Sequence, residues 1–280
     1  MKDNVIDFEA RYYLNKMDEA KSCLLNQDFR GIVNVLEDPC KKIDELLETE
    51  IYCPQNIFEQ AVCLNLLGKE VYPRNFARIN FYEFYKMMGA AFYNLGDKEK
   101  SKDYYEKAVK LDPASLFARI FEMKVSIELN DFEDFLTKIQ DAMYFAYYRS
   151  DMAKVYDLAG DYLVYKKDYE MALVSYNLSN SYVLNDDMVT KIKETAEKAE
   201  IDLNEKSFLA EDYMRKFYNT YKIALMPNQN IEKLSLAVAK DAYKNKDWWA
   251  SKLCYEINYD LTYDESLLPI IDELKEKCKK

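Results

Sequence analysis

The sequence predicts an all-α protein built from antiparallel helix pairs, and three observations support this fold class. First, the chain has only five glycines in 280 residues, too few for the many turns of a β-sandwich or barrel. Second, 49% of the residues are hydrophobic and 32% are charged, which is typical of many helices that each keep a polar face. Third, one short turn that contains an aspartate and an aromatic residue recurs along the chain.

The recurring turn places an aspartate directly before an aromatic residue. An aspartate in this position can cap the helix that follows, because its carboxylate accepts a hydrogen bond from a free backbone N–H. Turns at the spacing of helix pairs predict a repeat architecture. The four copies are Gln27-Asp28-Phe29, Asn130-Asp131-Phe132, Lys167-Asp168-Tyr169 and Lys246-Asp247-Trp248.

The clearest repeat unit spans residues 82–115. Small residues at Gly89, Ser101 and Ala108 let two antiparallel helices approach closely, and Pro113 ends the second helix. Leu95-Gly96-Asp97 forms the turn between them. The unit resembles the tetratricopeptide repeat at eight positions, namely Tyr85, Met88, Gly89, Phe92, Ser101, Tyr105, Ala108 and Pro113. This resemblance implies a tetratricopeptide-repeat-like α-solenoid, a right-handed superhelix of antiparallel helix pairs.

The same frame recurs over residues 153–184 with Gly160 and Tyr176, and weaker copies lie near both ends of the chain. The resemblance is clear over 82–184. Because no long Pro/Gly/Ser linker interrupts the chain, we expect residues 1–280 to form a single continuous helical-repeat domain. Residues 38–80 and 187–226 fit the frame poorly and predict irregular helices. A charged C-terminal helix at about 265–278 is expected to cap the array.

The apolar spacing predicts a series of short helices with the following approximate bounds. They lie near 8–25, 28–37, 40–50, 55–69, 75–95, 98–111, 114–129, 132–147, 150–166, 168–183, 187–200, 205–225, 230–245, 247–260 and 265–278.

Composition excludes several function classes. The chain has no histidine, so a Ser-His-Asp or Cys-His catalytic unit is excluded. Its net charge of −11 argues against nucleic acid as a partner. The six cysteines contain no Cys-x-x-Cys pair and predict free thiols rather than a metal site, and no cofactor is expected. Residues 1–9 lack the apolar core of a secretory signal and no apolar stretch could span a membrane, so we expect a cytoplasmic protein with no membrane partner.

In the family that the chain resembles, the first helix of each pair lines a concave groove that binds peptides. Carried over to this sequence, the groove candidates lie on single helical faces because they are spaced by three and four residues. The alternative is that they are ordinary exposed residues. The candidates are Glu83, Lys86, Tyr93 and Asn94; Phe117 and Lys124; Lys154, Asp157, Asp161 and Tyr165; and Lys240 and Tyr243.

The resemblance favours a non-catalytic scaffold or adaptor that binds a protein or peptide. Some family members hold a C-terminal carboxylate with lysines and asparagines, but here Ala90 and Phe121 replace two of the polar positions that such a clamp needs. Three alternatives stay open. They are an intracellular sensor of a short peptide or small ligand, an enzyme that works without histidine, and self-association through a terminal repeat.

Overall fold

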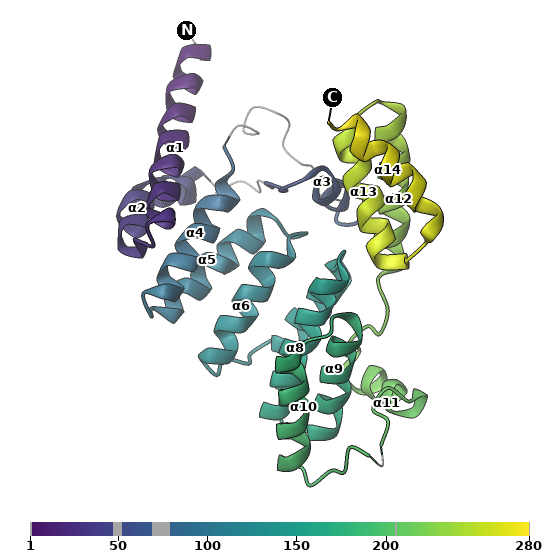
Figure 1. The fold of residues 1–280 in the computed structure, drawn as a ribbon. Coiled ribbons are helices and arrows are strands. Elements are labelled where there is room, and N and C mark those ends of the chain that lie inside the picture. The colour runs from purple at the N-terminus through teal and green to yellow at the C-terminus, as the bar shows by residue number, and fades with distance from the viewer. Residues whose placement is uncertain (1, 47–51, 69–78, 205, 280) are drawn as a thin grey trace. The chain divides into compact units, whose positions relative to one another are not determined.

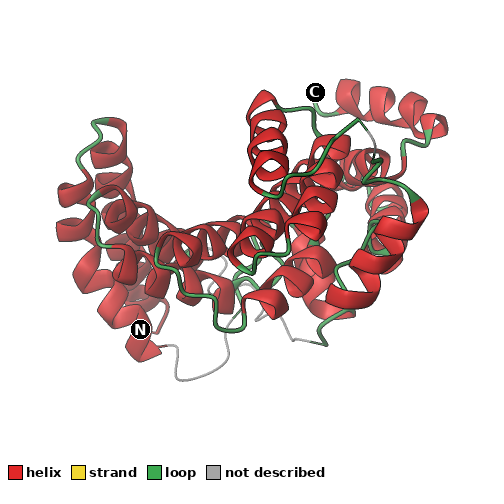
Figure 2. Cartoon of the chain, turned by 90° about the horizontal axis from the view of Figure 1, so that it is seen from below, coloured by secondary structure: helices red, strands yellow, loops and turns green. Residues whose placement is uncertain are grey.

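A computed structural model describes residues 2–46, 52–68, 79–204 and 206–279. These residues form 14 α-helices and one short 3-10 helix. They contain no strand, as Figure 2 shows. None of the described helices is both long and apolar enough to span a bilayer. Several neighbouring helices pack in pairs, so the expected class, an all-α fold of tetratricopeptide-like helix pairs, is confirmed.

Residues 1–129 form a first compact unit. Its helices pack in the order α1 on α2, α2 on α4, α4 on α5 and α5 on α6 (Figure 1). The core contains an aromatic cluster in which the ring of Tyr13 lies 5.4 Å from Phe81 and 5.9 Å from Phe84. The helices are α1 (Lys2–Leu25), α2 (Phe29–Leu46), α3 (Ile57–Asn65), α4 (Phe81–Asn94), α5 (Lys98–Leu111) and α6 (Leu116–Glu128).

Residues 130–280 form a second compact unit. Here α8 packs on α9, α9 on α10 and α11, and α12 on α13, which in turn packs on α14. That the two units form one continuous domain stays a prediction. The helices are α7 (Phe135–Phe145), α8 (Arg149–Tyr165), α9 (Tyr169–Tyr182), α10 (Asp186–Lys198), α11 (Glu211–Tyr221), α12 (Gln229–Lys244), α13 (Trp248–Thr262), η1 (Glu265–Leu267) and α14 (Leu268–Lys277).

The turn between paired helices has the same geometry in several repeats. The carboxylate of Asp97 accepts from the backbone N–H of Lys100 at 3.2 Å, and Asp28, Asp168 and Asp247 accept equivalent bonds at 2.7, 3.3 and 3.1 Å. The residue before each aspartate has a positive φ, between 55° and 84°. A left-handed residue ends one helix and an aspartate caps the next, so the capping expectation is confirmed at Asp28, Asp168 and Asp247.

The remaining predicted cap, at Asp131, is wrong. Asp131 does not cap α7, because that helix begins only at Phe135. Its carboxylate instead accepts from the N–H of Glu133, two residues on, at 3.3 Å. The actual N-cap, Asp134, has a φ of 53° and makes no side-chain capping bond. The extra residues of this turn displace the helix start from the position that the motif indicates.

The expected break at Pro39 is also wrong. Residues 28–37 and 40–50 were expected to form two helices, but α2 runs continuously from Phe29 to Leu46 with Pro39 inside it. A proline removes one helical hydrogen bond and strains the turn before it. The apolar stripe nevertheless continues across Pro39, since Leu36, Cys40 and Ile43 are all almost completely buried. Burial of this stripe outweighs the missing bond.

Other helix bounds shift at their ends. The helix expected over 205–225 covers only 211–221, because Phe208 is buried from a turn that precedes it. The helix expected over 55–69 ends at Asn65, and the one expected over 75–95 begins at Phe81 behind an Asn80 cap. Parts of the ranges expected at 40–50, 55–69, 75–95 and 205–225 lie outside the described residues.

Candidate functional site

One face of α4 packs against α5, and another face of α4 is therefore available to contact α6. Gly89 lies against the ring of Tyr105, and a β-carbon at Gly89 would come within 3.0 Å of it. The hydroxyl of Ser101 donates to the carbonyl of Gly89 at 2.8 Å. These contacts fix the rotation of α4 about its axis. Lys86 and Tyr93 then lie on a face of α4 that contacts side chains of α6.

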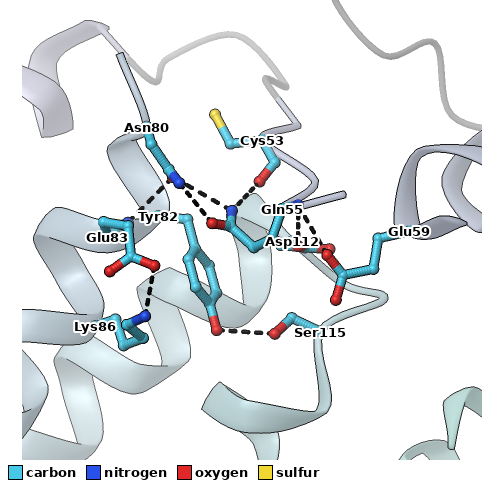
Figure 3. A network of polar contacts seen from close by, with 9 residues as sticks. All are labelled: Cys53, Gln55, Glu59, Asn80, Tyr82, Glu83, Lys86, Asp112 and Ser115. Atoms are coloured by element: carbon cyan, nitrogen blue, oxygen red, sulfur yellow. Dashed lines mark hydrogen bonds and ion pairs between the residues drawn. The ribbon is translucent and has the colours of Figure 1, made fainter. Parts of the chain in front are cut away.

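Lys86 joins this face to the start of α6. Its ammonium group forms an ion pair with Glu83 at 2.5 Å and lies 5.2 Å from the centre of the Phe117 ring. Phe117 is 44% exposed, and its ring lies 4.6 Å from that of Phe121. The structure therefore brings together three of the predicted candidates as a cation beside an exposed aromatic surface. Figure 3 shows Lys86 and Glu83 on the same turn of α4.

Tyr93 joins the other end of α4 to α6. Its hydroxyl donates to the carboxylate of Glu128, and Lys98 forms an ion pair with the same carboxylate at 2.8 Å. Lys124 is exposed, and its ammonium lies 5.6 Å from the Tyr93 ring centre. Burial tends to raise the pKa of Glu128, but the hydrogen bonds from Lys98 and Tyr93 lower it below its ordinary value. This carboxylate is therefore ionised at neutral pH.

Two of the four α8 candidates, Asp157 and Asp161, form a separate acidic cluster in the second unit. Lys191 of α10 bonds Asp157 at 2.6 Å and Asp161 at 2.8 Å, and Tyr176 donates to Asp161 at 2.7 Å. Burial raises the pKa of Asp157, and the bond from Lys191 opposes that shift. These two candidate carboxylates thus hold α10 against α8 and share the single positive charge of Lys191.

One C-terminal candidate, Tyr243, makes the same kinds of contact as Tyr93. The Tyr243 hydroxyl donates to Glu273 of α14 at 2.8 Å, and the ammonium of Lys277 lies 4.6 Å from its ring. Tyr93 and Tyr243 occupy equivalent places, four residues after Gly89 and Ala239. In both repeats a tyrosine on the first helix donates a hydrogen bond to a glutamate on the first helix of the following repeat. A lysine ammonium lies over the ring of each tyrosine.

Four candidates are not brought to a shared surface. Asn94 bonds the carbonyl of Ala90 within its own helix at 2.8 Å. Lys154 pairs with its neighbour Asp151 at 3.1 Å. Tyr165 stacks on Phe132 with 3.9 Å between ring centres, while Lys240 is an exposed residue of α12.

A partly buried polar network beside the α4 face was missed by sequence reasoning. Figure 3 shows Gln55 at its centre. The backbone N–H of Gln55 donates to Glu59 at 2.8 Å and to Asp112 at 3.1 Å, and its side-chain amide exchanges bonds with Asn80. The Tyr82 hydroxyl is 2.8 Å from that of Ser115. The network holds the chain before α3 against the starts of α4 and α6.

Two carboxyl groups share the buried end of this network. Glu59 and Asp112 are 2% and 0% exposed, and their carboxyl groups are hydrogen-bonded to each other. Burial, together with the charge of Glu59, raises the pKa of Asp112 to about 8. The pair therefore holds a proton at neutral pH. The sequence carried one weak signal for it, the aspartate directly before the repeat-ending Pro113, and none for Glu59.

The geometry of the helix pairs identifies the class of protein. Paired helices, aspartate-capped left-handed turns and small residues at the helix crossings are the features of a helical-repeat protein. Residues 82–115 match the family model of the tetratricopeptide repeat, which confirms the resemblance over that unit. Comparison with curated proteins gave no match. The matched residues cover α4, α5 and the turn that leads into α6.

Proposed function

We propose that this chain is a non-catalytic scaffold that binds a protein or peptide through the face shared by α4 and α6. Repeats of the family that residues 82–115 match are interaction modules, and the face lies within and directly after that match. The single observation that carries the proposal is Phe117. This large aromatic side chain is 44% exposed and lies between the ammonium of Lys86 and the ring of Phe121.

The chemistry of this face favours a partner segment with an apolar side chain next to an acidic one. Aromatic rings such as Phe117 supply contact area at little cost in conformational entropy. The exposed Lys124 supplies positive charge at one end of the α4–α6 contact, while Lys86 at the other end is paired with Glu83. Such a surface recognises acidic peptides in preference to basic ones, in a protein whose overall charge is −11.

The other candidates have a supporting role in this proposal. Tyr93, Asp157, Asp161 and Tyr243 each bond a residue of the next first helix. They set the spacing between repeats, and a ligand would reach them only by displacing those bonds. We place the protein in the cytoplasm, which the six free cysteines support because they form no disulfide.

A peptide display selection tests the proposal. A random peptide library is panned on the full-length protein, and the affinity of the enriched peptides is measured by calorimetry. We expect acidic peptides with one large apolar residue, and at least a tenfold loss of affinity in Phe117→Ser and in Lys124→Glu. The control is Lys110→Glu on α5, an exposed residue whose replacement makes the same charge change. Unaltered affinity in both face variants would refute the proposal.

A sensor of a short peptide or small ligand is the alternative that this selection also addresses. A scaffold binds its partner through a surface and keeps its repeat geometry, so amide exchange slows only on α4 and α6. A sensor instead changes the exposure of helices away from the ligand. Hydrogen exchange with and without the selected peptide therefore separates the two functions.

A further inference from the structure

Arg149 stands out in the second unit because its charged group is enclosed by aromatic rings rather than paired with a carboxylate. It is the first residue of α8. The guanidinium carbon lies 4.5 Å from the ring centre of Tyr182 and 4.6 Å from that of Tyr263. Tyr182 ends α9 and Tyr263 follows α13, so three helix ends contribute to one small site.

The hydrogen bonding of this guanidinium is incomplete. Its Nε is buried and has no hydrogen-bond partner, and within the described residues no carboxylate forms an ion pair with it. Asp260 lies close by, but its carboxylate accepts from the backbone N–H of Arg149 at 2.7 Å. Leaving a charged donor buried without an acceptor is unfavourable, and the two ring contacts offset this cost in part.

The two rings hold the guanidinium in a defined orientation. Tyr182 is anchored, since its hydroxyl donates to the carbonyl of Leu225 at 3.3 Å and its ring packs 5.6 Å from that of Tyr156. Tyr263 is 57% exposed and has a φ of 53°, so it forms the outer wall of the site. A planar fork held in this way has lost its rotational freedom before any ligand binds.

We propose that Arg149, clamped between Tyr182 and Tyr263, is a binding site for one oxyanion, the carboxylate or phosphate group of a ligand. Guanidinium groups bind both through two parallel N–H···O bonds. The flanking rings add apolar contact for the part of the ligand that carries the anion. This site lies in the second unit and does not depend on the function proposed for α4 and α6.

The test uses the Nε–H signal of Arg149 in a ¹⁵N-correlated NMR spectrum of the full chain, assigned by its loss in Arg149→Lys. Inorganic phosphate and sodium acetate are titrated separately at constant ionic strength. We expect a saturable shift of this signal with at least one of them. A shift with phosphate alone identifies a phosphate site, and one with acetate alone identifies a carboxylate site. No saturable shift with either ion up to about 100 mM would overturn the proposal.

Variants separate binding from packing. Arg149→Lys keeps the charge but removes the planar fork, so affinity measured on the amide signals of Tyr182 and Tyr263 should fall at least tenfold. The control is Arg215→Lys, which alters an exposed arginine that pairs with Glu211 and should bind as the wild type does. If Arg149 served only to pack the three helix ends, Arg149→Lys would lower the melting temperature and neither protein would show saturable binding.

Discussion

The ring of Tyr176 lies so close to Gly160 that a β-carbon on that glycine would come within 2.2 Å of the ring's Cε1 atom. The equivalent pair in the matched repeat, Gly89 and Tyr105, leaves 3.0 Å. Alanine is the better helix former by about 1 kcal/mol, so the two effects oppose each other. Gly160→Ala is expected to lower the free energy of unfolding by about 1–3 kcal/mol through overpacking.

The equivalent substitution Gly89→Ala should lower the free energy of unfolding by less than Gly160→Ala does. A movement of Tyr105 by a few tenths of an ångström would accommodate the methyl group. The larger Gly89→Leu should cost a few kcal/mol. Urea denaturation of the three variants measures their free energies of unfolding and so ranks these losses. Equal gains in Gly160→Ala and Gly89→Ala would show that the helices of these two pairs lie further apart than described.

Replacing a left-handed turn residue with glycine is expected to raise the stability of the protein. Lys246 has a φ of 61° directly before the cap Asp247, whereas the equivalent residue in the matched repeat is Gly96 with a φ of 84°. A residue with a β-carbon pays about 1 kcal/mol or more in this conformation. Lys246→Gly should therefore raise the free energy of unfolding, and Gly96→Ala should lower it. Lys240→Gly, inside the exposed face of α12, is the control and should be destabilising by about 1 kcal/mol.

The buried pair of Asp112 and Glu59 predicts an unusual dependence of stability on pH. The folded pKa of Asp112 is raised to about 8, well above its value of about 3.9 in an unfolded chain. The folded state therefore binds the extra proton, and this contribution to stability is lost as the pH rises from about 4 to about 8, by up to about 1.4 kcal/mol per pH unit. Asp112→Asn should flatten that slope in thermal melts. Asp103→Asn, an exposed aspartate on α5, should leave it unchanged.

Lys191 predicts a pH effect in the second unit. Removing its charge in Lys191→Met leaves Asp157 and Asp161 facing each other without a cation, so the pKa of Asp157 should rise further. All three side chains are about one-third exposed. Because solvent screens their charges, the free energy of unfolding at pH 7 should fall by only about 1 kcal/mol. This loss should become smaller as the pH falls and Asp157, whose pKa is already raised by burial, takes up a proton. A loss of equal size at pH 4, or the same loss in the exposed Lys193→Met, would contradict this.

Much of the repeat frame could be predicted because its signals are local. Gly89, Ser101 and the Asp97 turn lie within one helix pair, so their spacing alone predicts how α4 meets α5. The bond from Ser251 to the carbonyl of Ala239 repeats that of Ser101 to Gly89, which supports the weaker C-terminal copy. The continuity of α2 through Pro39 was missed because it depends on apolar burial against other helices.

The candidate site was predictable only in part. Helical spacing placed Lys86 and Tyr93 on one face of a helix, and in the structure both side chains contact α6, the helix that carries Phe117 and Lys124. It could not show that Tyr93 is bonded to Glu128, because that contact joins residues 35 positions apart. The Glu59–Asp112 pair joins segments still further apart in the sequence, and no periodic pattern connects them.

The proposal that α4 and α6 form the binding face is tested most directly by site-specific photo-crosslinking in the native host. A photoreactive phenylalanine replaces Phe117, and in a control it replaces Leu64, an apolar residue of similar exposure at 46%. The account predicts that one protein or peptide is crosslinked in stoichiometric amount at position 117 and not at 64. No crosslink at 117, or the same products at both positions, would contradict it.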